Sequence, residues 1–189
     1  SSVSANPTAG FSIAAYTGSG ANATVGHGLG QVPDLIIQKN RDNADNGWWV
    51  YSSIIGAGGE LRLDSNDSEM SDGSALWNST PPTSSVFSVG TNTGVNGSDD
   101  NCIAYCFRSV EGYSKVGSSY EGNGDLDGTF VYSKVGSYEG NGDADGTFVY
   151  TGFRPAFFMI KNIDSDYSWI IFDDKRNTYN PEENYLYPD

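Results

Sequence analysis

Two acidic segments near the middle of the chain have the residue types and spacing of a calcium loop. Calcium takes about six to eight oxygen ligands, and alternate Asn and Asp side chains beside a glycine turn can converge on one ion. An EF-hand also needs a bidentate Glu at the last position of its loop, where this chain has Lys134 and Gly152. Asn-Gly and Asp-Gly are also preferred dipeptides of hairpin turns. The segments therefore predict turns first and a calcium site second, with the candidate ligands Asn123, Asp125 and Asp127 in one copy and Asn141, Asp143 and Asp145 in the other.

Tryptophan side chains are the candidates for binding a sugar. Trp48, Trp49 and Trp169 could present flat ring faces to a glycan, with Asp and Asn side chains of neighbouring turns as hydrogen-bond acceptors. The alternative is that these rings fill the core, as aromatic residues on strands commonly do. Because neighbouring residues of a strand point to opposite faces, we expect one of Trp48 and Trp49 in the core and the other at the surface.

No combination of residues predicts a catalytic site. His27, the one histidine, lies among the glycines at 26, 28 and 30, a pattern that indicates a tight loop. No nucleophile elbow or metalloprotease helix motif accompanies it. The 24 Asp and Glu residues mostly occupy turn-like settings, and no two of them stand apart as a glycosidase pair. The sequence predicts a protein that is not an enzyme and needs no cofactor, calcium being the one candidate.

The two cysteines are predicted to be reduced packing residues. Cys102 and Cys106 lie in an apolar stretch that indicates a strand, where four steps span about 13 Å. A disulfide needs Cα atoms within roughly 7 Å, so the two cannot bridge each other. Reduced cysteines are typical of a protein that folds in a reducing cytoplasm.

The charge of the chain excludes whole classes of partner. Its 189 residues carry a formal net charge of −14, with only 10 Lys and Arg. Nucleic-acid binding relies on basic side chains that neutralise phosphates, so neither nucleic acid nor an anionic membrane surface is an expected partner. No apolar run approaches the roughly 20 residues that span a bilayer, so membrane insertion is not expected either.

Short apolar or alternating stretches bounded by Gly, Asn, Asp and Pro predict an all-β fold. This pattern is typical of antiparallel β-sandwich or jelly-roll-like modules. Residues 1–10 are predicted to be a flexible leader or linker, because they are rich in Ser and Ala and include Pro7. The candidate strands of the first module, residues 11–111, are 11–16, 35–39, 48–51, 60–64, 85–89 and 102–107.

The chain repeats itself, which predicts two modules in tandem. Tyr16, Pro33 and Lys39 correspond to residues 138, 155 and 161 at one constant offset. The second module, residues 112–189, is incomplete, because residues 185–187 take the place of 61–63 and nothing corresponds to the later strands of the first module. Within the second module, residues 113–149 contain a further duplication of a hairpin-like segment.

An incomplete module would leave strand edges and an apolar face uncovered. Two explanations stay open. The sequence could be part of a longer polypeptide, or a neighbouring chain could complete the module by adding strands and so form a polymer.

Several phrases of the sequence resemble, as a set, a module of phage virion proteins. They are residues 23–30, 33–40, 77–90, 103–107 with 110–115, and 150–156. The module is a domain of uncharacterised function found especially in marine and cyanobacterial phages, often in tail-fibre-like proteins. The resemblance covers nearly the whole chain after residue 10 and implies no catalytic residues. The doubled segment at 113–149 and the end at Asp189, where similar proteins continue, depart from the pattern.

Residue chemistry and resemblance together predict a non-enzymatic phage structural protein, in a tail fibre or another external virion appendage that contributes to attachment to host-surface glycans. The alternative is an architectural role, as a head-decoration protein or an extracellular filament subunit assembled by β-strand contacts between chains. The expected partners are further copies of the chain in a homotrimer or larger assembly, other virion proteins and host glycans. The expected location is the virion, after synthesis in the host cytoplasm.

Overall fold

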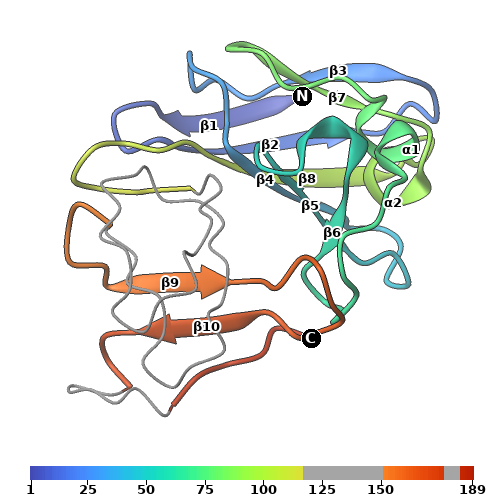
Figure 1. Ribbon diagram of the computed structural model, residues 1–189. Coiled ribbons are helices and arrows are strands. Elements are labelled where there is room, and N and C mark those ends of the chain that lie inside the picture. The colour runs from blue at the N-terminus through green and yellow to red at the C-terminus, as the bar shows by residue number, and fades with distance from the viewer. Residues whose placement is uncertain (117–150, 177–183) are drawn as a thin grey trace.

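A computed structural model of the protein describes residues 1–116, 151–176 and 184–189. Most of its regular structure is β-strand, and every strand pairing is antiparallel, so the prediction of an all-β fold is confirmed (Figure 1). No helix in these described ranges is long and apolar enough to cross a membrane. The elements are β1 (Ser2–Asn6), β2 (Phe11–Thr17), β3 (Ala23–Gly26), β4 (Leu35–Asn40), β5 (Trp48–Ser52), η1 (Gly56–Gly58), β6 (Leu61–Arg62), α1 (Gly73–Trp77), β7 (Val86–Val89), α2 (Thr93–Asn96), β8 (Asn101–Phe107), β9 (Phe157–Ile160) and β10 (Ile170–Asp173).

A six-stranded sheet in the order β1-β2-β8-β4-β5-β6 forms the centre of the molecule. Its upper face, which includes Ile36 and Tyr51, is covered by the two-stranded sheet of β3 and β7 (Figure 1). Its lower face, which includes Ile37 and Val50, looks toward the two-stranded sheet of β9 and β10. The upper layer has only two strands, which is smaller than the second sheet of a full sandwich.

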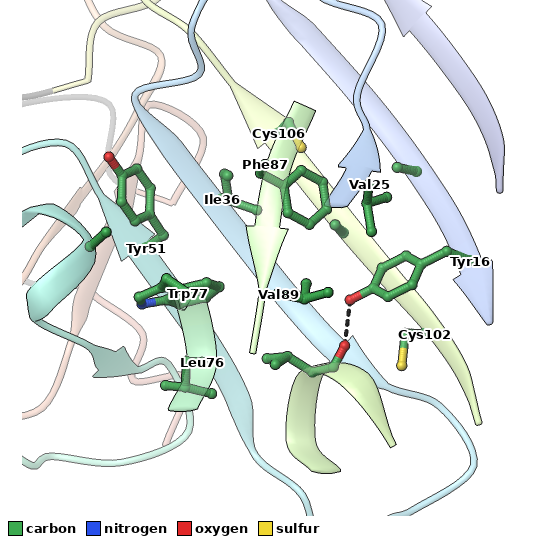
Figure 2. Packing of buried hydrophobic residues seen from close by; sticks show 14 of the residues in the cluster. Tyr16, Val25, Ile36, Tyr51, Leu76, Trp77, Phe87, Val89, Cys102 and Cys106 are labelled. Atoms are coloured by element: carbon green, nitrogen blue, oxygen red, sulfur yellow. Dashed lines mark hydrogen bonds between the residues drawn. The ribbon is translucent and has the colours of Figure 1, made fainter. Parts of the chain in front are cut away.

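The main core lies between the upper face of the large sheet and the β3–β7 layer (Figure 2). Phe87 of β7 is 1% exposed and meets the Tyr16 ring edge-on, with ring centroids 6.2 Å apart. Trp77 of α1 meets Tyr51 in the same way at 5.9 Å. The Tyr16 hydroxyl is buried but donates to the Val95 carbonyl at 2.6 Å, so the ring enters the core without an unpaired donor.

Residues predicted as a flexible leader instead form β1, an edge strand of the large sheet. Its five residues are all exposed and pair in register with β2. The connecting turn is held by bonds from the Ala9 N–H to Asn6 Oδ1 and from the Gly10 N–H to the Pro7 carbonyl. Gly10 has a φ of +70°, which glycine adopts readily. The prediction was wrong because an edge strand held by backbone bonds needs no apolar pattern.

The hairpin of the second module repeats that of the first. In the first hairpin Ile36 of β4 pairs with Tyr51 of β5. In the second, Phe158 of β9 pairs with Phe172 of β10 at the corresponding positions. Next to each hairpin a third segment pairs in the same way, through Leu61 in the first module and Leu186 in the second.

The turn chemistry is also repeated. Asn40 and Asn162 each accept, through Oδ1, the backbone N–H groups two and three residues further on. The preceding lysines, Lys39 and Lys161, each donate through Nζ to a backbone carbonyl late in their own turn. This Lys-Asn pair therefore specifies the same turn in both modules.

The second module packs against the lower face of the first. Trp169, directly before β10, is 5% exposed and packs with Val50 and Leu61. The loop after β6 also bonds to the second-module turn. These bonds run from Lys161 Nζ to the Asn66 carbonyl (3.0 Å), from the Ser68 N–H to Asp166 Oδ1 (2.9 Å) and from the Glu69 N–H to the Ile163 carbonyl (2.9 Å).

A buried acid, Glu60, directly precedes β6. It is 5% exposed, and its Oε2 has no hydrogen-bond partner. Burial, and then the charge of Asp72, raise the pKa of Glu60 to about 7, although Arg62 opposes the shift. Since an unfolded Glu titrates near 4.5, the folded state keeps a proton that the unfolded state has lost between these two values. Stability therefore falls as pH rises through this window and is level above it.

We expect Glu60→Gln to remove this pH dependence. The variant should unfold like the wild type at pH 4 and be more stable by about 1–3 kcal/mol at pH 8. Urea unfolding at several pH values measures the difference between the two curves. Glu111→Gln, at an exposed position, is the control and should follow the wild type, whereas a constant difference between Glu60→Gln and wild type at all pH values contradicts the prediction.

Candidate carbohydrate-contact site

The structure places Trp48 and Trp49 on opposite faces of the large sheet. Trp49 pairs with Gln38 and packs against the main core. The guanidinium carbon of Arg62 lies 5.4 Å from the Trp49 ring centroid. A Cβ on Gly94 would lie 2.2 Å from Trp49 Nε1, so only glycine lets the α2 backbone come this close. Trp49 is therefore the member of the pair that packs on the main core, although it is half-buried like Trp48.

Trp169 serves the module junction rather than the surface. Its indole Nε1 donates to the Arg62 carbonyl at 2.7 Å, 107 residues away in the chain. With 5% of its surface exposed, its ring is covered where the second module meets the first. The Trp169 ring is not accessible to a sugar in this arrangement.

Trp48 is half-buried on the lower face and starts a row of aromatic rings. It stacks on Tyr105 of β8, with ring centroids 6.3 Å apart and planes inclined by 29°. Two residues further along β8, Phe107 packs on Phe11 of β2 at 4.9 Å. These four half-buried residues, which we call the first-module strip, are Trp48, Tyr105, Phe107 and Phe11.

Polar groups lie at the end of the sheet where the strip begins. Lys39 is the cross-strand neighbour of Trp48. Asp42 Oδ2 accepts the backbone and side-chain N–H groups of Asn101 at 2.7 and 2.8 Å. These bonds lower the pKa of Asp42, which keeps its carboxylate charged. The strip offers ring faces for the apolar side of a sugar, and the sheet end where it begins carries a carboxylate that can accept from sugar hydroxyls.

Tyr105, Phe107 and Phe11 are not among the site residues predicted from the sequence. Alternation in the 101–107 segment places Tyr105 and Phe107 on one face, and this signal was available. Phe11 lies opposite Phe107 because of the antiparallel register of β2 with β8. This register cannot be predicted from the local sequence pattern.

The candidate calcium ligands Asn123, Asp125, Asp127, Asn141, Asp143 and Asp145 lie outside the described residues. Within the residues that are described, no group of three or more His, Cys, Asp and Glu side chains could hold a metal ion. The calcium site stays a prediction.

His27 is a buried structural residue. Its Nδ1 accepts the Leu29 N–H at 3.3 Å, so Nε2 carries the proton and donates to the Thr83 carbonyl at 3.1 Å. Burial lowers the pKa of His27, which favours this neutral form. The ring thus connects its glycine-rich loop to the segment before β7.

The cysteines are free and buried, as predicted. Burial raises the pKa of Cys102 to about 11 and that of Cys106 to about 12. Both are therefore thiols at neutral pH, and neither is an activated nucleophile.

Comparison with known protein families gives one match, made twice along the chain. The family model covers residues 1–133 and again residues 132–189. The chain belongs to the DUF7483 family, a domain of unknown function. The two DUF7483 matches meet near residue 132, whereas the sequence analysis placed the boundary between residues 111 and 112, so that boundary stays a prediction. No curated protein and no solved structure matches the chain.

Proposed function

We propose that this DUF7483 protein is a non-enzymatic structural protein of a phage virion, part of a tail fibre or another external appendage, and that it contributes to attachment to host-surface glycans. The observation that carries the proposal is the first-module strip, in which Trp48 and Tyr105 stack side by side on a rigid sheet. Strands hold such side chains in place more firmly than loops do. The acidic surface of the chain suits a neutral or amino sugar better than an anionic one.

Weak contacts of this kind suit an appendage present in many copies. A single ring stacked on a sugar contributes little, but several identical sites on one particle raise the overall avidity by orders of magnitude. The partners in this proposal are further copies of the chain and other virion proteins, with the glycan on the host surface.

We expect Trp48→Ala to weaken glycan binding about tenfold, which corresponds to about 1.4 kcal/mol. The measurement is binding of the purified chain to an array of bacterial surface polysaccharides, followed by titration of the best ligand. Tyr167→Ala is the matched control, because Tyr167 is 64% exposed but lies outside the strip. Circular dichroism should show that both variants keep the wild-type fold.

Wild-type binding by a folded Trp48→Ala variant would remove the strip from the proposal. Immunogold labelling of purified virions tests the location separately. Absence of the protein from virions would contradict the phage assignment, whatever the chain binds.

A further inference from the structure

The second module carries a row of aromatic rings on the face that points away from the first module. Phe158 stacks on Phe172, with ring centroids 4.7 Å apart and planes inclined by 19°. The row continues from Phe172 to Tyr185 at 5.8 Å and from Tyr185 to Tyr187 at 5.3 Å. We call this row, Phe158, Phe172, Tyr185 and Tyr187, the second-module strip.

The repeat of the hairpins shows what this face corresponds to. Phe158 and Phe172 hold the positions that Ile36 and Tyr51 hold in the first module. There, Ile36 and Tyr51 are 1% and 4% exposed, because Phe87 and Trp77 cover them from the β3–β7 layer and α1 (Figure 2). The second-module strip is therefore the counterpart of a core face.

Among the described residues of the second module, no strand or helix takes the place of β3, β7 or α1. Phe158, Tyr185 and Tyr187 are accordingly 39%, 45% and 54% exposed. Contiguous exposed aromatic surface of this kind usually marks a contact with another protein.

We propose that the second-module strip is a self-association surface, on which a second copy of this chain docks face to face and buries the same strip of its own. The first module indicates the kind of element that covers such a face, because its cover is a two-stranded sheet of four-residue strands. The β9–β10 hairpin is also a two-stranded sheet of four-residue strands. In each copy the β9–β10 hairpin thus carries the exposed strip and also has the size of the β3–β7 sheet that covers the corresponding face in the first module.

The contact is isologous, since the same patch meets itself about a twofold axis, and it closes at a dimer. The side chains of the strip are uncharged, so no buried charge opposes the contact. Aromatic rings of about 150–250 Å² each, exposed to these fractions, leave roughly 300 Å² per copy to bury. The two copies together would bury roughly 600 Å². That total lies below the roughly 1,200–2,000 Å² of stable interfaces, so we expect a weak, concentration-dependent dimer.

Sedimentation velocity of the full chain over about a hundredfold range of concentration tests the contact. We expect a monomer–dimer equilibrium that strengthens with added NaCl, because salt screens the repulsion between copies of charge −14. Tyr187→Ser should weaken dimerisation at least about tenfold, because Tyr187 is 54% exposed, more than Phe158 or Tyr185, and its ring would be covered in the dimer. Tyr167→Ser is the matched control and should dimerise like the wild type, because Tyr167 is also exposed (64%, against 54% for Tyr187) but lies outside the strip.

Each other outcome overturns the proposal. A wild-type monomer at every concentration shows that the strip does not associate, and growth into open polymers shows that strand edges rather than faces meet. Equal dimerisation of Tyr187→Ser and wild type places the contact elsewhere. Near-ultraviolet circular dichroism confirms that the variants are folded, and the Trp48→Ala binding measurement stands or fails separately, because Trp48 lies outside this surface.

Discussion

Replacing Trp169 by Ala should detach the second module from the first. The substitution removes a ring that packs on Val50 and Leu61 and leaves the Arg62 carbonyl without its donor. Loss of a buried tryptophan costs about 3–5 kcal/mol. Because the contact joins two modules, we expect the loss to appear as undocking of residues 151–176 while β1–β8 stay folded.

Hydrogen exchange measured by mass spectrometry locates this effect. Protection should fall in β9, in β10 and in the loop after β6, whose Ser68 and Glu69 N–H groups bond to the second module. Trp169→Phe is the control, since it keeps a buried aromatic ring while losing the Nε1 donor and part of the indole volume, and it should cost less than Trp169→Ala, about 1–3 kcal/mol. Unchanged protection in the loop after Trp169→Ala would show that the junction does not depend on this ring.

Replacing Phe87 by Ala should destabilise the first module by about 3–5 kcal/mol. Phe87 is 1% exposed, and it joins the β3–β7 layer to the upper face of the large sheet at Tyr16. The cavity would open in the middle of the layer, where the surrounding strands cannot easily collapse into it. Such a cost is a large part of the stability of an average domain.

Urea unfolding followed by tryptophan fluorescence measures this change. Phe87→Leu is the matched control and should lose only about 1–2 kcal/mol, because most of the apolar volume stays. A Phe87→Ala variant within about 1 kcal/mol of the wild type would mean that the upper layer contributes little to the core.

The glycan proposal and the self-association proposal rest on opposite faces of corresponding hairpins in the two modules. In the first module the upper face is closed by its own chain, and the aromatic residues available for a ligand lie on the lower face with Trp48. In the second module Trp169, which corresponds to Trp48, is buried where the two modules meet. The exposed rings of the second module lie on the opposite face of its hairpin. One repeated hairpin thus presents different surfaces, according to which of its faces is covered.

Much of the fold could be predicted from local signals. The strands at 11–16, 35–39, 48–51 and 102–107 were predicted to within one residue of their observed bounds, because alternation and turn residues mark them. The segment 60–64 contracts to Leu61–Arg62, although the Leu63 N–H still donates to the Trp48 carbonyl and Asp64 Oδ1 accepts the Trp48 N–H. β1 was missed because its side chains are all exposed.

By itself, the sequence determined the features that depend on residue type and short-range spacing. These are the all-β class, the repeat of Tyr16, Pro33 and Lys39 at residues 138, 155 and 161, the cysteines that cannot bridge and the placement of Trp48 and Trp49 on opposite faces. Each follows from residue types and their spacing or from backbone geometry within a few residues, so no distant contact is needed to infer it.

Only the tertiary structure decided which aromatic residues are accessible. Trp48 begins β5 and Trp169 directly precedes β10 at the corresponding position of the repeated hairpin. Yet Trp48 is half-buried beside Tyr105, and Trp169 is covered at the junction. The difference arises because burial depends on what packs against a face, and the residues that pack against Trp169 come from about 100 residues earlier in the chain. Such long-range contacts follow from strand register and module packing, which local sequence patterns do not encode.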